Sequence, residues 1–372
     1  MEADKFSLSS PGVLEKYQEA GKIAKAAMQH AISQCLPSAD IYTICSSTNT
    51  LIQELCKKSY VKSKIEKGPA FPPCISVNNI CGHFCPLKDE SVKLKSGDVA
   101  KIDLGVHIDG FPVNLAHTVV VGGISENDPN RNLLSAAYTG IETMVKNLGP
   151  GVSNYDVTEN LTKVLKDYGV TALEGVLSHE LGRYALNGDV CIGTTADPEQ
   201  RVNESELKIN QVFSLDVLVS ANAEEGKSKE SELRTTVFKR NIDVTYDLKT
   251  SMARSFLNQI KTNSHDMAFS ISLMENALEA RVGSNECLKH GHLEAFNVVQ
   301  EKSGAVVAHF KWTVAISSKR IILLASHCEP GFEVIKPSEA LMKDEKLGPL
   351  LTKTLEDVTL SKKKKKAKKN KK

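Results

Sequence analysis

The stretch from Val99 to Val121 constrains the fold more than any other part of the chain. Two runs of alternating apolar residues flank Asp109–Gly110, a pair typical of a two-residue hairpin turn with positive φ. Pairing outward from this turn predicts that Asp103 lies opposite Ala116. Asp103 and Asn114 then share one face of the hairpin, close enough to hold a single ion between them. On the hairpin alone, a carboxylate hydrogen-bonded near a strand end explains Asp103 equally well.

The composition is typical of a soluble globular protein. Of the 372 residues, 25% are charged and 41% are hydrophobic. No apolar leader follows Met1 and no run of about eighteen apolar residues occurs, so we expect neither secretion nor membrane insertion. The nine cysteines are scattered without a CxxC pair, which favours buried thiols in a reducing compartment over disulfides or a zinc site.

The charge is distributed very unevenly along the chain. Residues 361–372 contain nine lysines and no acidic residue. Removing these nine from the 47 basic residues leaves 38 against 45 acidic ones, so the body carries a net charge near −7. Because the lysine block has nothing apolar to bury, we expect it to be disordered. It favours contact with a polyanion such as nucleic acid, a ribosome or a nuclear import receptor, and a solubilising tail is the alternative.

Two helix pairs are predicted, each followed by strands. Amphipathic spacing predicts helices over 14–35 and 41–55, separated by a proline break. A second pair is predicted over 133–144 and 157–168, with Asn154 as the N-cap of the latter. This repeated order predicts two structurally similar halves.

The remaining segments predict strands and one further helical region. We expect 57–73 to be a basic connection that leads into a short ISVNN strand. Residues 247–291 are predicted to be helical, and 296–316 to form another hairpin. Asp216 and Lys311 each interrupt an otherwise apolar strand, and a charge in that position must be paired or lie at a rim.

A set of motifs follows the order typical of the methionine aminopeptidase ("pita-bread") fold. These motifs are FPPCISVNN, GHF, KIDLGVHIDG, NLAHT, LSHELGRY, SLDVLV and AHFKWT. The chain most closely resembles the proliferation-associated, ErbB-receptor-binding proteins, catalytically dead relatives of the type 2 methionine aminopeptidases. It shares with them the KIDLGVH–DG hairpin, RTT at 234–236 and the lysine-rich tail.

The resemblance implies an α+β fold in which a pseudo-two-fold antiparallel sheet is covered by helix pairs. We expect a pita-bread domain over 1–330 that contains a type 2 helical insert at 238–292. A C-terminal extension over 331–360 and the disordered polylysine tail at 361–372 would follow.

The resemblance also implies a vestigial metal site. The active aminopeptidases hold two metal ions with two aspartates, one histidine and two glutamates. The matching residues here are Asp103, Asn114, His179, Asp216 and Lys311, and His83 matches a pocket histidine outside the metal shell. Repulsion between an ammonium and a divalent ion ~4 Å apart is on the order of 8 kcal/mol even at an effective dielectric near 20.

We therefore expect the Lys311 ammonium to occupy the ion's place and neutralise Asp103 and Asp216. No metal, no cofactor and no aminopeptidase activity are predicted. Two alternatives stay open: a single metal held by Asp103, His179 and Asp216, and an active metallo-aminopeptidase that removes N-terminal methionine. Three other strand histidines, His107, His117 and His309, are predicted to be hydrogen-bonded packing residues.

The resemblance implies a function in ribosome biogenesis, translation and growth control. The expected partners are the large ribosomal subunit near the tunnel exit, rRNA or other structured RNA, and proteins such as a signalling receptor or transcription factors. The expected locations are the cytoplasm and the nucleus or nucleolus. A peptide-binding adaptor that uses the vestigial pocket is a further alternative. The candidate RNA contacts are basic residues of the first connection, the insert and the tail: Lys57, Lys58, Lys62, Lys64, Lys249, Arg254, Lys261, Lys362, Lys363, Lys364, Lys365, Lys366, Lys368 and Lys369.

Overall fold

The computed structural model describes residues 6–195, 202–222, 226–302, 304–327 and 329–359. The lysine-rich segment 361–372, with the contacts predicted for it, lies outside the described residues. None of the helices in the described part of the chain is both long and apolar enough to cross a membrane.

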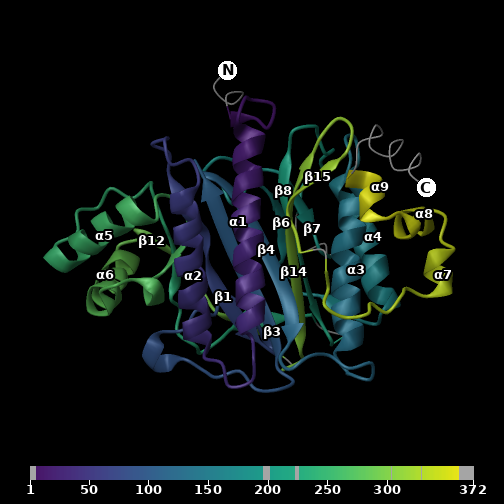
Figure 1. Ribbon diagram of the computed structural model, residues 1–372, viewed down its shortest axis with the longest axis horizontal. Coiled ribbons are helices and arrows are strands. Elements are labelled where there is room, and N and C mark those ends of the chain that lie inside the picture. Colours follow the sequence, from purple (N-terminus) through teal and green to yellow (C-terminus); the bar gives the residue numbers. More distant parts are fainter. Residues whose placement is uncertain (1–5, 196–201, 223–225, 303, 328, 360–372) are drawn as a thin grey trace.

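An antiparallel sheet of nine strands forms the centre of the molecule (Figure 1). Its main path runs in the order β1-β3-β4-β14-β8-β6-β7, with β15 beside β14 and β5 beside β8. The strands are β1 (Lys67–Val77), β3 (Val99–Ile108), β4 (Phe111–Val120), β5 (Thr171–Ala172), β6 (Leu177–Glu180), β7 (Cys191–Gly193), β8 (Val212–Ser220), β14 (Val307–Ile316) and β15 (Ile321–Ala325).

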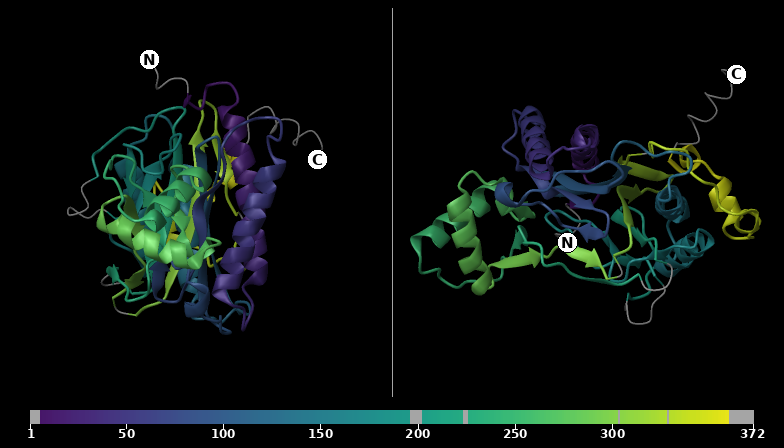
Figure 2. Two further views of the ribbon diagram at one scale, coloured as in Figure 1. Left: turned by 90° about the vertical axis from the view of Figure 1, so that its left-hand side faces the viewer. Right: turned by 90° about the horizontal axis from the view of Figure 1, so that it is seen from below.

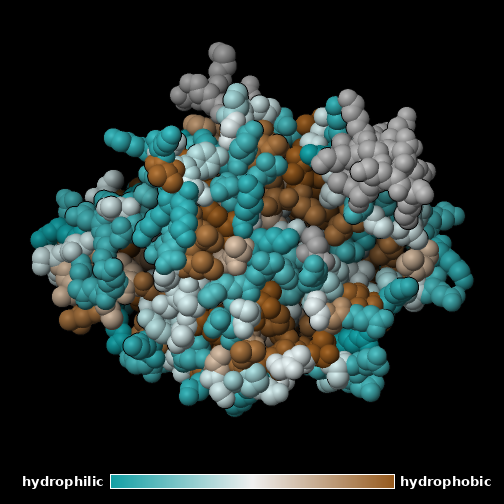
Figure 3. Space-filling view, in the orientation of Figure 1, coloured by the Kyte–Doolittle hydropathy of each residue, from teal (hydrophilic) through white to brown (hydrophobic). Residues whose placement is uncertain are grey.

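Two helix pairs cover this sheet. They are α1 (Val13–Gln34) with α2 (Ile41–Lys58), and α3 (Arg131–Asn147) with α4 (Asn154–Asp167). The first pair packs on β1, β3 and β4, whereas α3 packs on β8 and β14 and α4 on β7. Figure 2 shows the first pair as a layer on one side of the sheet. Polar side chains predominate on the outer surface of α1 and α2, and apolar ones lie between the helices (Figure 3). Two helix pairs on one antiparallel sheet are the predicted pita-bread architecture.

The central hairpin has the register that the sequence predicts. Asp103 lies opposite Ala116, and Gly105 lies opposite Asn114. Asp109 and Gly110 at the turn have φ of 54° and 77°, the left-handed conformation that a tight hairpin turn requires.

Two local predictions about element boundaries are wrong. The N-cap of α4 is Ser153, whose side chain accepts from Tyr155 N, whereas Asn154 is buried and donates to two backbone carbonyls. The strand predicted at ISVNN begins at Lys67, within the predicted connection. Its prolines are accommodated by register shifts between Pro69 and Phe71 and before Cys74, so they do not break the strand.

The predicted hairpin over 296–316 does not form. Strand β13 (Val299–Glu301) pairs instead with β2 (Ile80–Gly82) and β9 (Ser228–Glu230). Strand β14 pairs with β4, β8 and β15. Strand β14 is almost entirely buried, so its apolar side chains favour a central place in the large sheet over a local partner.

A small helical unit lies at one end of the long axis and a C-terminal segment at the other (Figures 1 and 2). The unit contains β10 (Val237–Arg240), α5 (Ser251–Asn263), β11 (Phe269–Ser270), the 3-10 helix η3 (Ile271–Leu273), α6 (Ala277–Lys289) and β12 (Leu293–Phe296). A second apolar cluster, which includes Phe238, Phe256 and Leu293, forms its interior. The short helix η2 (Lys88–Glu90) supplies Asp89, which pairs with Arg281 of α6. The C-terminal segment carries α7 (Glu339–Met342), α8 (Gly348–Thr352) and α9 (Leu355–Thr359).

Candidate functional site

The sheet register places three of the predicted pocket residues in one row across four strands. Asp103 on β3 lies opposite Ala116 on β4, and Ala116 lies opposite Lys311 on β14. Lys311 in turn lies opposite Asp216 on β8. Side chains that face each other across neighbouring strands lie on the same face of the sheet. The row therefore directs the Lys311 side chain between two carboxylates.

The Lys311 ammonium binds both carboxylates directly. Its Nζ lies 2.9 Å from Asp103 Oδ2 and 3.1 Å from Asp216 Oδ2. The three side chains are largely buried, with exposed fractions of 16% for Lys311, 9% for Asp103 and 16% for Asp216. As the sequence predicts, Lys311 lies between Asp103 and Asp216. Its single positive charge offsets one of their two negative charges, whereas the sequence predicted that both would be neutralised.

We call Lys311, Asp103 and Asp216 the ion triad, and the charges within it fix the protonation of Lys311 and Asp216. Burial alone would lower the pKa of Lys311, but the two carboxylates raise it above its usual range. Burial alone would raise the pKa of Asp216, but the Lys311 ammonium and the neighbouring His309 hold it well below its usual range. Lys311 is therefore an ammonium and Asp216 a carboxylate at neutral pH.

His309 is a buried, hydrogen-bonded histidine, as the sequence predicts. The sequence did not identify its partner, which is Asp216: His309 Nε2 lies 2.7 Å from Asp216 Oδ1. The strand alternation of β14 was the available signal, since His309, Lys311 and Thr313 share a face. Thr313 hydrogen-bonds the backbone of Asn114, with its Oγ1 lying 2.8 Å from both Asn114 N and Asn114 O.

The two remaining pocket histidines have partners other than the carboxylates of the ion triad. His83 Nδ1 lies 2.9 Å from Asn297 O, and its ring packs against Phe71 and Phe296. His179 Nδ1 lies 3.3 Å from the Cys191 sulfur, a neighbour that the sequence did not suggest. Burial lowers the pKa of both imidazoles, so they are neutral side chains at neutral pH.

These residues do not fit a pair of metal ions. Among the described residues, no group of three or more His, Cys, Asp or Glu side chains is arranged to hold a metal. Asp103 Oδ1 and Asn114 Oδ1 are buried and have no hydrogen-bond partner in the described part of the chain, but the ammonium beside them would repel a divalent cation. Asn114 and Lys311 also supply fewer negative charges than a dinuclear site needs.

The predicted basic contacts on the body fall into separate groups. Lys57, Lys58, Lys62 and Lys64 are all exposed at the end of α2 and in the loop after it. Lys57 lines a groove of about 640 Å³ between α2 and α5, whereas Lys58 lines a hollow with Glu15, Glu19 and Lys22. Arg254 and Lys261 together line a third hollow, of which Lys249 is not part.

The comparisons with known proteins agree with this geometry. Residues 15–237, more than half of the chain, match the model of metallopeptidase family M24. The chain therefore belongs to metallopeptidase family M24. Within the family it groups with the ErbB-3-binding and proliferation-associated proteins, as the motifs predict.

Curated relatives match over most of their length. ErbB-3 binding protein 1 of Arabidopsis thaliana is 38% identical over 325 residues, covering 87% of this chain and 82% of the relative. A protein of Schizosaccharomyces pombe named curved DNA-binding protein is 33% identical over 366 residues, covering 97% and 95%. The methionine aminopeptidase of Archaeoglobus fulgidus is 27% identical over 305 residues, covering 82% and 95%.

Solved structures confirm the fold. A thermophilic Arx1 has a TM-score of 0.82 at 24% identity, covering 93% of this chain and 99% of that one. The methionine aminopeptidase of Thermotoga maritima has a TM-score of 0.58 at 19% identity, covering 87% and 100%. The chain is thus a methionine-aminopeptidase-like protein with the pita-bread fold.

Proposed function

We propose that this chain is a non-catalytic member of its family that binds RNA and the large ribosomal subunit. The observation that carries the first half of this proposal is the Lys311 ammonium, 2.9 Å from Asp103 and 3.1 Å from Asp216. In the family's peptidases the metal ions generate the hydroxide that attacks the peptide. A protonated lysine can neither lower the pKa of a bound water as a divalent ion does nor accept its proton.

The charge distribution supports the second half of the proposal. Nine lysines in the last twelve residues supply affinity for a polyanion through counterion release. This attraction is independent of sequence, so the folded body must supply specificity. The name of the Schizosaccharomyces pombe relative, curved DNA-binding protein, supports a nucleic acid as the partner. The name ErbB-3 binding protein supports a protein partner as well.

The ribosomal subunit and the location of the protein complete the proposal. We place the binding site near the tunnel exit, with a role in ribosome biogenesis and translation in the cytoplasm and nucleolus. The exposed lysines Lys57, Lys58, Lys62 and Lys64 are the proposed contacts at the end of α2. The tail lysines add affinity, whereas these body lysines fix the orientation.

Co-sedimentation with purified large ribosomal subunits tests this function. The full chain is compared with a form that ends at Leu360, each at low salt and at about 150 mM salt. We expect the shortened form to pellet with subunits at the higher salt, because the body carries the specific site. Loss of all binding on removing the tail, or with a modest rise in salt, would show non-specific attraction and overturn the proposal.

A further inference from the structure

The connection between α2 and β1 carries positive charge that no neighbouring carboxylate offsets. We call residues 57–64 the lysine loop, because it contains the exposed side chains of Lys57, Lys58, Lys62 and Lys64. Among the described residues, none of these four lysines forms an ion pair. Glu66, which follows the loop, pairs with His265 instead. The lysine loop therefore presents a concentrated positive charge to solvent.

The backbone of the lysine loop forms a turn at the surface. Tyr60 has a φ of 48°, and Ser63 N donates to Tyr60 O at 3.0 Å. Val61 within the turn is 73% exposed, and Ser63 is exposed as well. A surface turn of this kind can be reached by an enzyme without unfolding of the sheet or the helices.

The two serines of the lysine loop differ in their contacts. Ser59 is half-buried, and its Oγ donates to Glu19 Oε1 at 2.6 Å. Ser63 Oγ makes no hydrogen bond with any other described residue. The hydroxyl of Ser63 is therefore available to a modifying enzyme, whereas the hydroxyl of Ser59 is held against α1.

The charges around Ser63 suit one class of modifying enzyme. Lys62 and Lys64 flank Ser63, and Lys57 and Lys58 precede it. Protein kinases select their substrates by the charge pattern around the acceptor residue. A kinase whose substrate groove is acidic would attract this basic turn and bring Ser63 to its active site.

We propose that Ser63 is a phosphorylation site for a serine/threonine kinase that selects basic residues. Ser63 Oγ attacks the γ-phosphorus of ATP, which enters with Mg²⁺ in the kinase. The bond from that phosphorus to the β–γ bridging oxygen breaks, and ADP leaves. The hydroxyl proton passes to the catalytic base of the kinase.

The phosphate would reverse part of the charge of the lysine loop. It adds about −1.5 to −2 at pH 7 and so offsets up to half of the four positive charges. The lysine loop contains the proposed ribosome contacts at the end of α2, so phosphorylation weakens binding to the large subunit. This regulatory role rests on the proposed function, whereas the modification of Ser63 does not.

Mapping of phosphate tests the modification. The full chain and an unstructured peptide of residues 53–68 are incubated with ATP and two kinases that select basic residues, cyclic-AMP-dependent protein kinase and protein kinase C. Mass spectrometry then locates the phosphates. We expect both Ser59 and Ser63 to be modified in the peptide, but Ser63 in clear excess over Ser59 in the full chain. A full chain without phosphate on Ser63, or with equal phosphate on the two serines, would overturn the inference.

Co-sedimentation with large ribosomal subunits tests the regulatory role. The parent chain and Ser63→Ala, which lacks only the acceptor hydroxyl, receive the same kinase treatment. At about 150 mM salt we expect the treated parent to bind about tenfold more weakly than treated Ser63→Ala, with a salt slope smaller by about 1–2. Without kinase, Ser63→Asp should weaken binding, whereas Ser125→Asp, which adds the same charge at an exposed position outside the lysine loop, should not.

The outcomes separate this inference from the proposed function. Equal binding of the treated parent and treated Ser63→Ala would overturn the regulatory role alone. An untreated chain that binds no subunits even at low salt would overturn the proposed function and the regulatory role together. The phosphate map decides the modification of Ser63 in either case.

Discussion

At the scale of single residues, Lys311 separates two buried carboxylates that would otherwise repel each other. We expect Lys311→Met to lower the free energy of unfolding by about 3–5 kcal/mol, because it leaves Asp103 and Asp216 buried without their counter-ion. Urea denaturation at pH 7 measures the change. The control Lys319→Met removes an exposed lysine beyond the end of the same strand and should change stability by less than about 0.5 kcal/mol. A loss below about 1 kcal/mol for Lys311→Met would contradict the role given to the ion triad.

The same variant should change the pH dependence of stability. In the parent chain the folded pKa of Asp216 lies below its unfolded value, so its contribution is present above about pH 4 and is lost as pH falls through the folded pKa. Without the ammonium, the two carboxylates repel, and the folded state binds protons more readily than the unfolded chain. We therefore expect the difference in free energy of unfolding between the parent chain and Lys311→Met to become smaller as the pH falls from 7 to 5.

A second buried lysine, Lys101, allows an independent prediction about how stability depends on pH. Lys101 is 1% exposed and donates to Asn78 O at 2.8 Å, and burial lowers its pKa from 10.5 to about 7. Between about pH 7 and pH 10 the unfolded chain binds the extra proton, so the contribution of Lys101 to stability rises with pH. The free energy of unfolding of the parent minus that of Lys101→Met should therefore increase between pH 7 and pH 9. A difference that stays constant over this range would show that Lys101 is charged in the folded state.

At the scale of elements, the contact between α5 and α6 depends on a glycine. A Cβ placed on Gly283 of α6 would lie 2.4 Å from Phe256 Cβ on α5. We expect Gly283→Ala to force the helices apart and cost about 1–3 kcal/mol. Hydrogen exchange of Gly283→Ala should be faster than that of the parent chain in 251–289, and the same as in the parent chain in the central sheet. The neighbouring exposed change Asn285→Ala is the control and should leave exchange unchanged. Unaltered protection in Gly283→Ala would contradict the close packing of the two helices.

The elements also show how far the sequence could predict the fold. The central hairpin was predictable in its register, because a two-residue turn and strict alternation leave one pairing. The proline-containing start of β1 was not, since a proline signals a break unless register shifts accommodate it. The partners of β14 were also beyond prediction, because alternation defines the faces of a strand but does not identify its distant neighbours.

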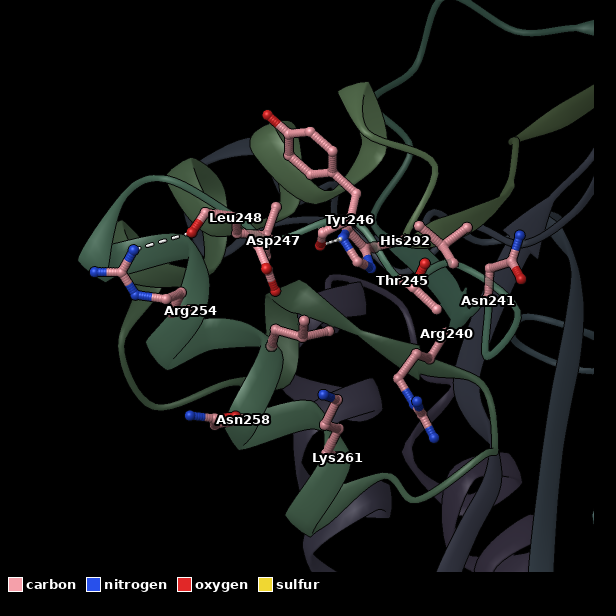
Figure 4. A pocket seen from close by; sticks show the side chains of 12 residues that line it. Arg240, Asn241, Thr245, Tyr246, Asp247, Leu248, Arg254, Asn258, Lys261 and His292 are labelled. Atoms are coloured by element: carbon pink, nitrogen blue, oxygen red, sulfur yellow. Dashed lines mark hydrogen bonds between the residues drawn. The ribbon is translucent and has the colours of Figure 1, made fainter.

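The candidate site, like the fold, was predictable from the sequence only in part. The row of Asp103, Lys311 and Asp216 was predictable from motifs that resemble a known family, and the distances confirm it. The contact of His309 with Asp216 depends on side-chain placement across two strands, which sequence spacing does not specify. The hollow lined by Arg254 and Lys261 could be found only in the structure, because its walls come from α5 and the separate segment 240–248 (Figure 4).

At the scale of the whole molecule, the ion triad lies within the central sheet of a fold shared with the aminopeptidases. The helical unit and the C-terminal segment lie at opposite ends of the long axis (Figure 1). The body is acidic overall, with a net charge near −7 against +9 in residues 361–372. Association with RNA should therefore weaken steeply with salt for the full chain and less steeply for a form that ends at Leu360. Equal salt slopes for the two forms would contradict a contact between the tail and RNA.

The most direct test of the central claim is a calorimetric titration of the metal-free full chain with Mn²⁺ and Co²⁺, followed by an assay of methionine release from a short peptide. The triple variant Asn114→Asp/Asp216→Glu/Lys311→Glu, which restores the ligand types of the peptidases, is the comparison. We predict that the parent chain binds no stoichiometric metal and releases no methionine, whereas the triple variant gains metal binding. Close to two equivalents of metal in the parent chain, together with turnover of the peptide, would contradict the account.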